Sequence, residues 1–232
     1  MKRNINFTLI ILMLSWCCIS CHCRNKSTTT DNDKNSIQTG DLLFVELPYT
    51  YCLNDHSADS ILLKQLTGRE DINYIHVAIL EKDENDSIWV IDATLAKGVD
   101  RHPYSQFLEA FTLNDGSYPN MKIMRLKNAE NAAKYVENAK QFCGTAYDCS
   151  FLIDNDSLYC SELVYRAYVN DKGESLFQLC PINFMTEDSL MPPYWDDLFM
   201  LIDKKIPQGN TGILPSDLMK DDQLEMANVK LQ

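Results

Sequence analysis

HVAIL, residues 76–80, and IWVID, residues 88–92, are two β-rich segments separated by the polar residues 81–87. Apolar and β-branched runs with a polar connection between them are typical of a hairpin, here one with a longer loop. His76 opens the first segment and Asp92 closes the second, so an antiparallel pairing brings their side chains close together. This hairpin is the predicted centre of the fold.

The strands and helices predicted around the hairpin indicate an α+β fold. Residues 41–45 and 121–126 are short apolar runs typical of strands. Four helices are predicted, at residues 57–66, 103–111, 128–142 and 158–169. Asn128 and Ser157 are the predicted N-caps of the last two, and the Pro- and Asp-rich sequence after Cys180 predicts coil and short turns. Together these elements predict an antiparallel sheet with helices packed on it.

Length and charge narrow the possible functions. The chain has 232 residues, 45% of them apolar, which is enough to bury one sizeable core. We therefore expect one principal domain, at residues 38–232. The formal net charge of −12 gives no electrostatic reason to bind phosphate backbones, so a nucleic-acid partner is not expected. The sequence also lacks an internal apolar run of the roughly 18 residues that a membrane-spanning helix needs.

The N-terminus reads as a targeting segment. Residues 1–20 combine a basic start with a mostly apolar stretch, as in a signal segment. Ser20 followed by Cys21 resembles a bacterial lipoprotein box, which makes Cys21 the predicted lipidation site, and ordinary cleavage with secretion is the alternative. Residues 21–37 are polar, lack periodicity and predict a flexible tether. The protein is thus expected in the bacterial cell envelope, held to the membrane by a lipid.

The remaining cysteines do not form a recognisable framework. Five of them lie in the predicted domain, so even full pairing leaves one thiol free; they are Cys52, Cys143, Cys149, Cys160 and Cys180. A disulfide among the four other than Cys160 stays open. No pair has the two-residue spacing of a zinc site, and neither a metal nor a cofactor is predicted.

Cys160 is the best candidate for a nucleophile. It falls in the first turn of the last predicted helix, as the third helical residue if Ser157 is the N-cap. Unpaired backbone N–H groups and the positive end of the helix dipole stabilise an anion there, and the thiolate is the form of cysteine that attacks carbonyls. The alternative is a structural role, because Cys160 also lies on an apolar stripe with Leu163, Val164 and Ala167.

His76 and Asp92 supply the other groups that a thiol nucleophile needs. The imidazole can take the thiol proton, and the carboxylate can fix the imidazole tautomer. An Asp on an otherwise apolar strand face also requires a partner. As alternatives, His76 is a structural hydrogen-bonding residue and Asp92 marks the end of a strand. His22, His56 and His102 are predicted to be solvated or capping residues.

Four segments, taken in order, resemble the YiiX-like branch of the NlpC-type, papain-like hydrolases. They are residues 40–44, 74–79, 90–93 with 98–99, and 147–164. The resemblance implies a circularly permuted papain-like fold, in which the histidine precedes the cysteine. It also implies that Cys160 is the nucleophile, His76 the base and Asp92 the third polar residue, a position often occupied by Glu in this branch.

The same resemblance implies a function. It is that of a cysteine amidase or peptidase that cleaves amide bonds through a thioester on Cys160. The implied substrates are cell-wall-type peptides, acylated amino acids or lipid-like molecules. Acyl transfer by the same residues, and a non-catalytic module that binds lipid or peptide, are the alternatives.

Overall fold

The computed structural model describes residues 35–53, 65, 68, 70–113, 115–229 and 231. The predicted signal segment, the lipidation site Cys21 and most of the predicted tether lie outside these residues. The predicted helix at residues 57–66 lies almost wholly outside them as well.

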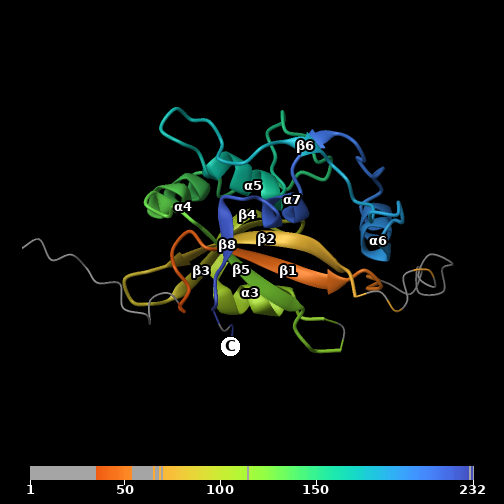
Figure 1. The fold of residues 1–232 in the computed structure, drawn as a ribbon, viewed down its shortest axis with the longest axis horizontal. Helices are drawn as coiled ribbons and strands as arrows, with labels where there is room; N and C mark the ends of the chain where they lie inside the picture. Colours follow the sequence, from red (N-terminus) through yellow and green to blue (C-terminus); the bar gives the residue numbers. More distant parts are fainter. Residues whose placement is uncertain are drawn as a thin grey trace, which may run out of the picture.

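A six-stranded antiparallel sheet forms the centre of the protein, with strand order β4-β3-β2-β1-β5-β8 (Figure 1). The strands are β1 (Leu42–Pro48), β2 (Ile72–Lys82), β3 (Ile88–Thr94), β4 (Gly98–Pro103), β5 (Asn120–Leu126) and β8 (Leu224–Met226). The predicted hairpin is present as β2 and β3. The predicted α+β class is confirmed, and β4 and β8 are strands that the sequence pattern did not reveal.

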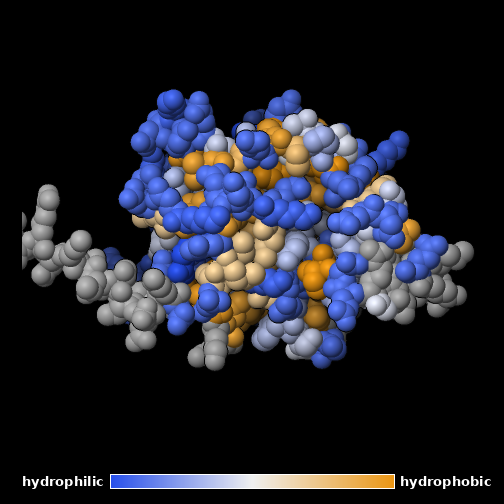
Figure 2. All heavy atoms as spheres, in the orientation of Figure 1, coloured by the Kyte–Doolittle hydropathy of each residue, from blue (hydrophilic) through white to orange (hydrophobic). Residues whose placement is uncertain are grey.

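Helices cover both faces of this sheet. Figure 1 shows α4 (Ala132–Lys140), α5 (Cys160–Ala167) and α7 (Pro215–Met219) on one side and α3 (Tyr104–Ala110) on the other. The C-terminal part adds α6 (Pro193–Leu201) and a short pair of strands, β6 (Cys180–Pro181) and β7 (Thr211–Gly212). Hydrophilic residues cover most of the face seen in Figure 2, and apolar atoms appear between them in patches.

Because helices cover both faces of the sheet, the protein has two apolar cores. Leu42 and Phe44 of β1 belong to the core under α4 and α5, whereas Leu43 and Val45 belong to the core that includes Phe107 of α3. Alternate residues of a strand point to opposite faces, so a strand buried on both sides reads as a continuous apolar run. This explains the sequence of residues 41–45. No helix in the described part of the chain is long and apolar enough to cross a membrane.

The cap predicted for the third helix is wrong. α4 begins at Ala132 with Asn131 at the N-cap position, not at Asn128. The Asn128 side chain instead accepts a hydrogen bond from the backbone N–H of Glu130 (3.2 Å). Asn side chains form such local turns readily, and these compete with helix capping.

The cap predicted for the last helix is also wrong. α5 begins at Cys160 and its N-cap residue is Tyr159, which makes no side-chain cap hydrogen bond. The Ser157 hydroxyl donates to Asn155 Oδ1 (2.7 Å) in a turn before the helix. Cys160 is therefore the first helical residue and not the third.

The region after Cys180 is more ordered than predicted. α6 is a nine-residue helix that opens with Pro193, a residue favoured in the first turn because its missing N–H has no helical partner. Trp195 and Phe199 lie one turn apart and are both buried, and the indole N–H of Trp195 donates to Asn73 Oδ1 of β2 (3.0 Å). All five cysteines of the described residues are free, so no disulfide forms among them.

Candidate active site

An irregularity in β2 places His76 beside a cavity. The pairing of β1 with β2 passes from Val45 opposite His76 to Glu46 opposite Tyr74, which leaves Ile75 as an extra residue in β2. Such a β-bulge bends its strand and changes where neighbouring side chains point. Ile75 and His76 accordingly both line the same cavity.

Asp92 of β3 binds the imidazole of His76, as the hairpin pattern predicted. Asp92 Oδ2 lies 2.7 Å from His76 Nε2, and the two residues are only 1% and 7% exposed. The ring of His76 also packs against Phe111 and Phe107, with centroid distances of 4.8 and 6.1 Å. The carboxylate and the two aromatic rings together fix the orientation of the imidazole.

Cys160 is the first residue of α5, and its thiol lies beside this imidazole. It is 4% exposed, and the His76 imidazole and the backbone N–H groups of Val77 and Ser161 lie close enough to lower its pKa. Because Asp92 occupies Nε2, Nδ1 is the ring nitrogen available to the sulfur. The structure thus brings together all three predicted site residues.

Charge interactions shift the pKa values of the Cys160 and His76 pair in opposite directions. Burial raises the pKa of the Cys160 thiol, but the His76 imidazole and the N–H groups of Val77 and Ser161 outweigh it and lower that pKa. Burial lowers the pKa of His76, but the negative charges of Cys160 and Asp92 outweigh it and raise that pKa to about 10. Both shifts therefore favour a thiolate facing an imidazolium.

The other cysteines show the opposite behaviour. Burial raises the pKa of each of their thiols, and in Cys180 the effect, strengthened by Asp217, reaches about 11; the other three are Cys52, Cys143 and Cys149. Cys160 is thus the thiol of the described residues whose pKa is lowered, and the one with an imidazole beside it.

A cavity of about 130 Å³ lies next to Cys160 and His76. Its walls include Phe111, Tyr147 and Phe151, together with Tyr194 and Leu198 of α6. None of the described residues lining it is Lys, Arg, Asp or Glu. Sequence reasoning missed the α6 wall because it predicted coil there.

Residues 36–227 match the model of a family described as permuted papain-like amidase enzymes, the YaeF/YiiX or C92 family. The chain belongs to this family. The match confirms the predicted permuted papain-like fold and identifies the protein as a cysteine amidase or peptidase-like hydrolase. A comparison with curated proteins finds no match for this chain.

A solved structure similar to this permuted amidase is that of YiiX from Escherichia coli O157:H7, which is described as a metalloprotein. The two share 22% sequence identity with a TM-score of 0.55, over 82% of this chain and 95% of the other. This likeness supports the fold. In the part of this chain that the structure describes, no group of three or more His, Cys, Asp and Glu side chains is arranged to hold a metal ion.

The permuted amidase also has a second histidine near Asp92, which the sequence analysis assigned wrongly. His102 lies in β4 opposite Val90 and is 6% exposed, so it is neither solvated nor a helix cap. Its Nδ1 is 3.9 Å from Asp92 Oδ1 and 3.6 Å from Asp100 Oδ2. One signal pointed to this placement: the residue before a proline, here Pro103, favours extended backbone and hence a strand.

Proposed function

We propose that the protein hydrolyses an amide bond through Cys160 as nucleophile, His76 as general base and acid, and Asp92 as the residue that orients His76. The observation that carries this proposal is the buried Cys160 and His76 pair, in which the pKa of the thiol is lowered and that of the imidazole raised. A lowered thiol pKa favours a reactive cysteine over a module that only binds ligands.

The chemistry proceeds in two stages. The Cys160 thiolate attacks the amide carbonyl, and backbone N–H groups at the start of α5, which face the sulfur, stabilise the oxyanion. The His76 imidazolium then gives its proton to the departing amine, the C–N bond breaks, and a thioester on Cys160 remains. Neutral His76 next takes a proton from water, the hydroxide attacks the thioester, the C–S bond breaks, and the carboxylic acid leaves as the Cys160 thiolate is restored beside the His76 imidazolium.

The cavity favours an acylated amino acid with an apolar acyl group over a cell-wall-type peptide. An acyl portion with charged side chains, such as that of a cell-wall-type peptide, would need partners of opposite charge, and no Lys, Arg, Asp or Glu is among the described residues that line the cavity. A volume of about 130 Å³ compares with the roughly 150 Å³ apolar cavity that binds benzene. We therefore expect an acyl group of about the size of a phenyl ring.

Selective labelling and a substrate series test this proposal. Iodoacetamide at mildly acidic pH should alkylate Cys160 ahead of the other four cysteines. N-phenylacetylglycine should be hydrolysed faster than N-acetylglycine, N-palmitoylglycine or a γ-linked dipeptide. Cys160→Ala should lower kcat by a factor on the order of 10⁴ or more, whereas the matched variant Cys149→Ala should leave it unchanged. Equal labelling of all five cysteines, or activity retained in Cys160→Ala, would place the nucleophile elsewhere.

We also propose that the domain works at the surface of a bacterial membrane, held by a lipid on Cys21. The basic and apolar start of the chain and the Ser20-Cys21 pair support this location. Cys21→Ala should move the protein from the membrane fraction to the soluble fraction of the producing cells, as followed by immunoblot. Wild-type protein that is already soluble after processing would instead indicate plain secretion.

A further inference from the structure

Two buried polar atoms beside the catalytic pair lack hydrogen-bond partners. Asp92 Oδ1 and His102 Nδ1 are both in this state among the described residues, and they lie 3.9 Å apart. Buried polar atoms in folded proteins are nearly always satisfied, and each exception calls for an explanation. These two atoms face each other, so a single hydrogen bond between them would satisfy both.

The surroundings of His102 favour a neutral ring with its proton on Nδ1. Burial lowers the pKa of His102, although the charges of Asp92 on β3 and Asp100 on its own strand oppose this shift, and Lys97 and His76 favour it. A neutral imidazole carries one N–H group. Nδ1 is the nitrogen near two carboxylates, at 3.9 Å from Asp92 and 3.6 Å from Asp100, so the proton is most useful there.

We propose that His102 is a positioning residue that donates a hydrogen bond from Nδ1 to Asp92 Oδ1 and so holds Oδ2 on His76 Nε2. Hydrogen bonds of this type span about 2.7–3.2 Å, and a small rotation of the ring or one bridging water closes the gap. Cys160, His76, Asp92 and His102 then form one line across α5, β2, β3 and β4. This inference rests on the proposed function of the first three residues.

The role assigned to His102 is distinct from substrate binding. His102 does not line the cavity beside Cys160, so its loss should change kcat and leave KM within about twofold. Residues that orient metal-binding side chains through hydrogen bonds typically contribute about 10–100-fold to affinity or activity, and we expect the same scale for a residue that orients Asp92. His102→Leu, which removes the donor, should thus lower kcat by about tenfold. His102→Asn, which can place an amide N–H near the position of Nδ1, should restore most of it.

Tyr104 provides a matched control. Its hydroxyl is likewise buried without a partner among the described residues. Its ring stacks on Phe107 at 6.3 Å and 14°, much as the ring of His102 does at 6.4 Å and 13°. Tyr104→Phe therefore removes a buried polar group from the same aromatic cluster without touching Asp92, and its kcat should match that of the wild type.

Nitrogen-15 NMR of the histidine rings in the full protein gives a test that does not depend on any substrate. In the wild type we expect His102 to be neutral with Nδ1 protonated, and the Nε2 proton of His76 to resonate far downfield because of its short bond to Asp92. That proton signal should persist in Tyr104→Phe and His102→Asn and move upfield and broaden in His102→Leu.

Three results would overturn the inference. They are an Nε2-protonated His102 in the wild type, an unchanged His76 signal in His102→Leu, and a kcat for His102→Leu equal to that of Tyr104→Phe. If His102→Leu does not fold, the tautomer of His102 in the wild type and the kcat of His102→Asn still test the inference. A wild type that hydrolyses no amide would count against the proposed function, whereas the NMR spectrum would still show whether His102 holds Asp92.

Discussion

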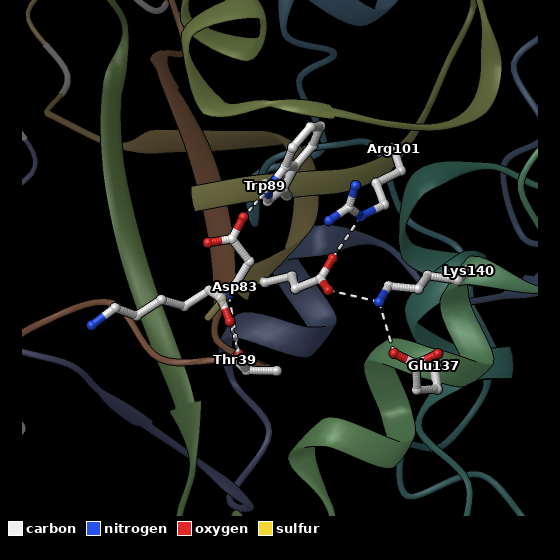
Figure 3. A network of polar contacts seen from close by, with 8 residues as sticks. Thr39, Asp83, Trp89, Arg101, Glu137 and Lys140 are labelled. Atoms are coloured by element: carbon white, nitrogen blue, oxygen red, sulfur yellow. Dashed lines mark hydrogen bonds and ion pairs between the residues drawn. The ribbon is translucent and has the colours of Figure 1, made fainter. Parts of the chain in front are cut away.

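Two polar clusters share the strands β2, β3 and β4, and they are built in opposite ways. The line from Cys160 to His102 is buried, and two of its atoms lack partners among the described residues. The second cluster, shown in Figure 3, centres on Glu81, which accepts hydrogen bonds from Arg101 and Lys140, both at 2.6 Å. Its members are partly exposed and paired with each other.

The second cluster ties neighbouring elements together. Arg101 of β4 also lies over the ring of Trp89 of β3, at 3.9 Å from the ring centroid. Lys140 connects α4 to the same Glu81 of β2. Burial raises the pKa of Glu81, but Arg101 and Lys140 outweigh it and lower that pKa. In this cluster the lowered pKa of Glu81 reflects its pairing with Arg101 and Lys140, whereas in the buried line the proposed function uses the charges in a reaction.

Stability and the proposed chemistry thus depend on different side chains of the same strands, which on β4 are the neighbouring residues Arg101 and His102. A buried charge is expensive unless it is fully satisfied. An enzyme accepts such a cost at its active site because charge must develop there during the reaction. Substitutions in the buried line should thus lower kcat, whereas substitutions in the cluster around Glu81 should lower the free energy of unfolding.

Among the substitutions that keep the Cys160 nucleophile, the largest effect is expected from Asp92→Asn. The carboxylate fixes the tautomer of His76 and helps raise its pKa. An amide does neither, so kcat should fall by about 10³–10⁴. The variant also tests the pH profile. In the wild type kcat/KM should rise as Cys160 loses its proton below the ordinary thiol value, and fall as His76 loses its proton near pH 10. In Asp92→Asn the alkaline limb should move to lower pH.

Thermal melts complete the test of Asp92→Asn. Because Asp92 carries a buried oxygen without a partner among the described residues, replacing its charge should shift the melting temperature by only a few degrees. A strongly destabilised Asp92→Asn variant with undiminished kcat would assign Asp92 a structural role and break the contrast between the two clusters.

Local patterns in the sequence revealed the first half of the site. The alternating and apolar runs of β2 and β3 predict a hairpin, and hairpin neighbours are close in the chain, so the His76 and Asp92 contact follows from them. Cys160 was found because a helix start favours a thiolate. Its contact with His76 joins residues far apart in the chain, and it was indicated by the complementary chemistry of the two side chains and by the family resemblance, not by a local pattern.

Apart from the proline after His102, the rest of the site depends on contacts that leave no local signal. β4 contains Asp100, Arg101 and His102, a polar run without the apolar alternation of a strand, and its pairing with β3 is what buries His102. α6 is held by contacts with distant elements, such as the Trp195 bond to Asn73 of β2. The α6 wall of the cavity therefore could not be predicted from a pattern along the chain, and the contact of His102 with Asp92 depends on the pairing of β3 with β4.

The smallest effect is expected from Glu81→Gln in the second, partly exposed cluster. Partly exposed ion pairs contribute modestly, so the free energy of unfolding at pH 7 should fall by about 1 kcal/mol. The pKa of Glu81 is lowered in the folded state, so its contribution is complete above the ordinary value of 4.5 and disappears as the pH falls through the lowered value. In urea unfolding, the free energies of unfolding of the wild type and the variant should therefore become equal at acidic pH. They should also become equal in about 1 M salt, where screening is strong.

The kcat of Glu81→Gln should stay within about twofold of the wild type, because the cluster adds stability and takes no part in the reaction. A loss of kcat comparable to that of Asp92→Asn would show that the two clusters are coupled through β2 and that the division between them is wrong.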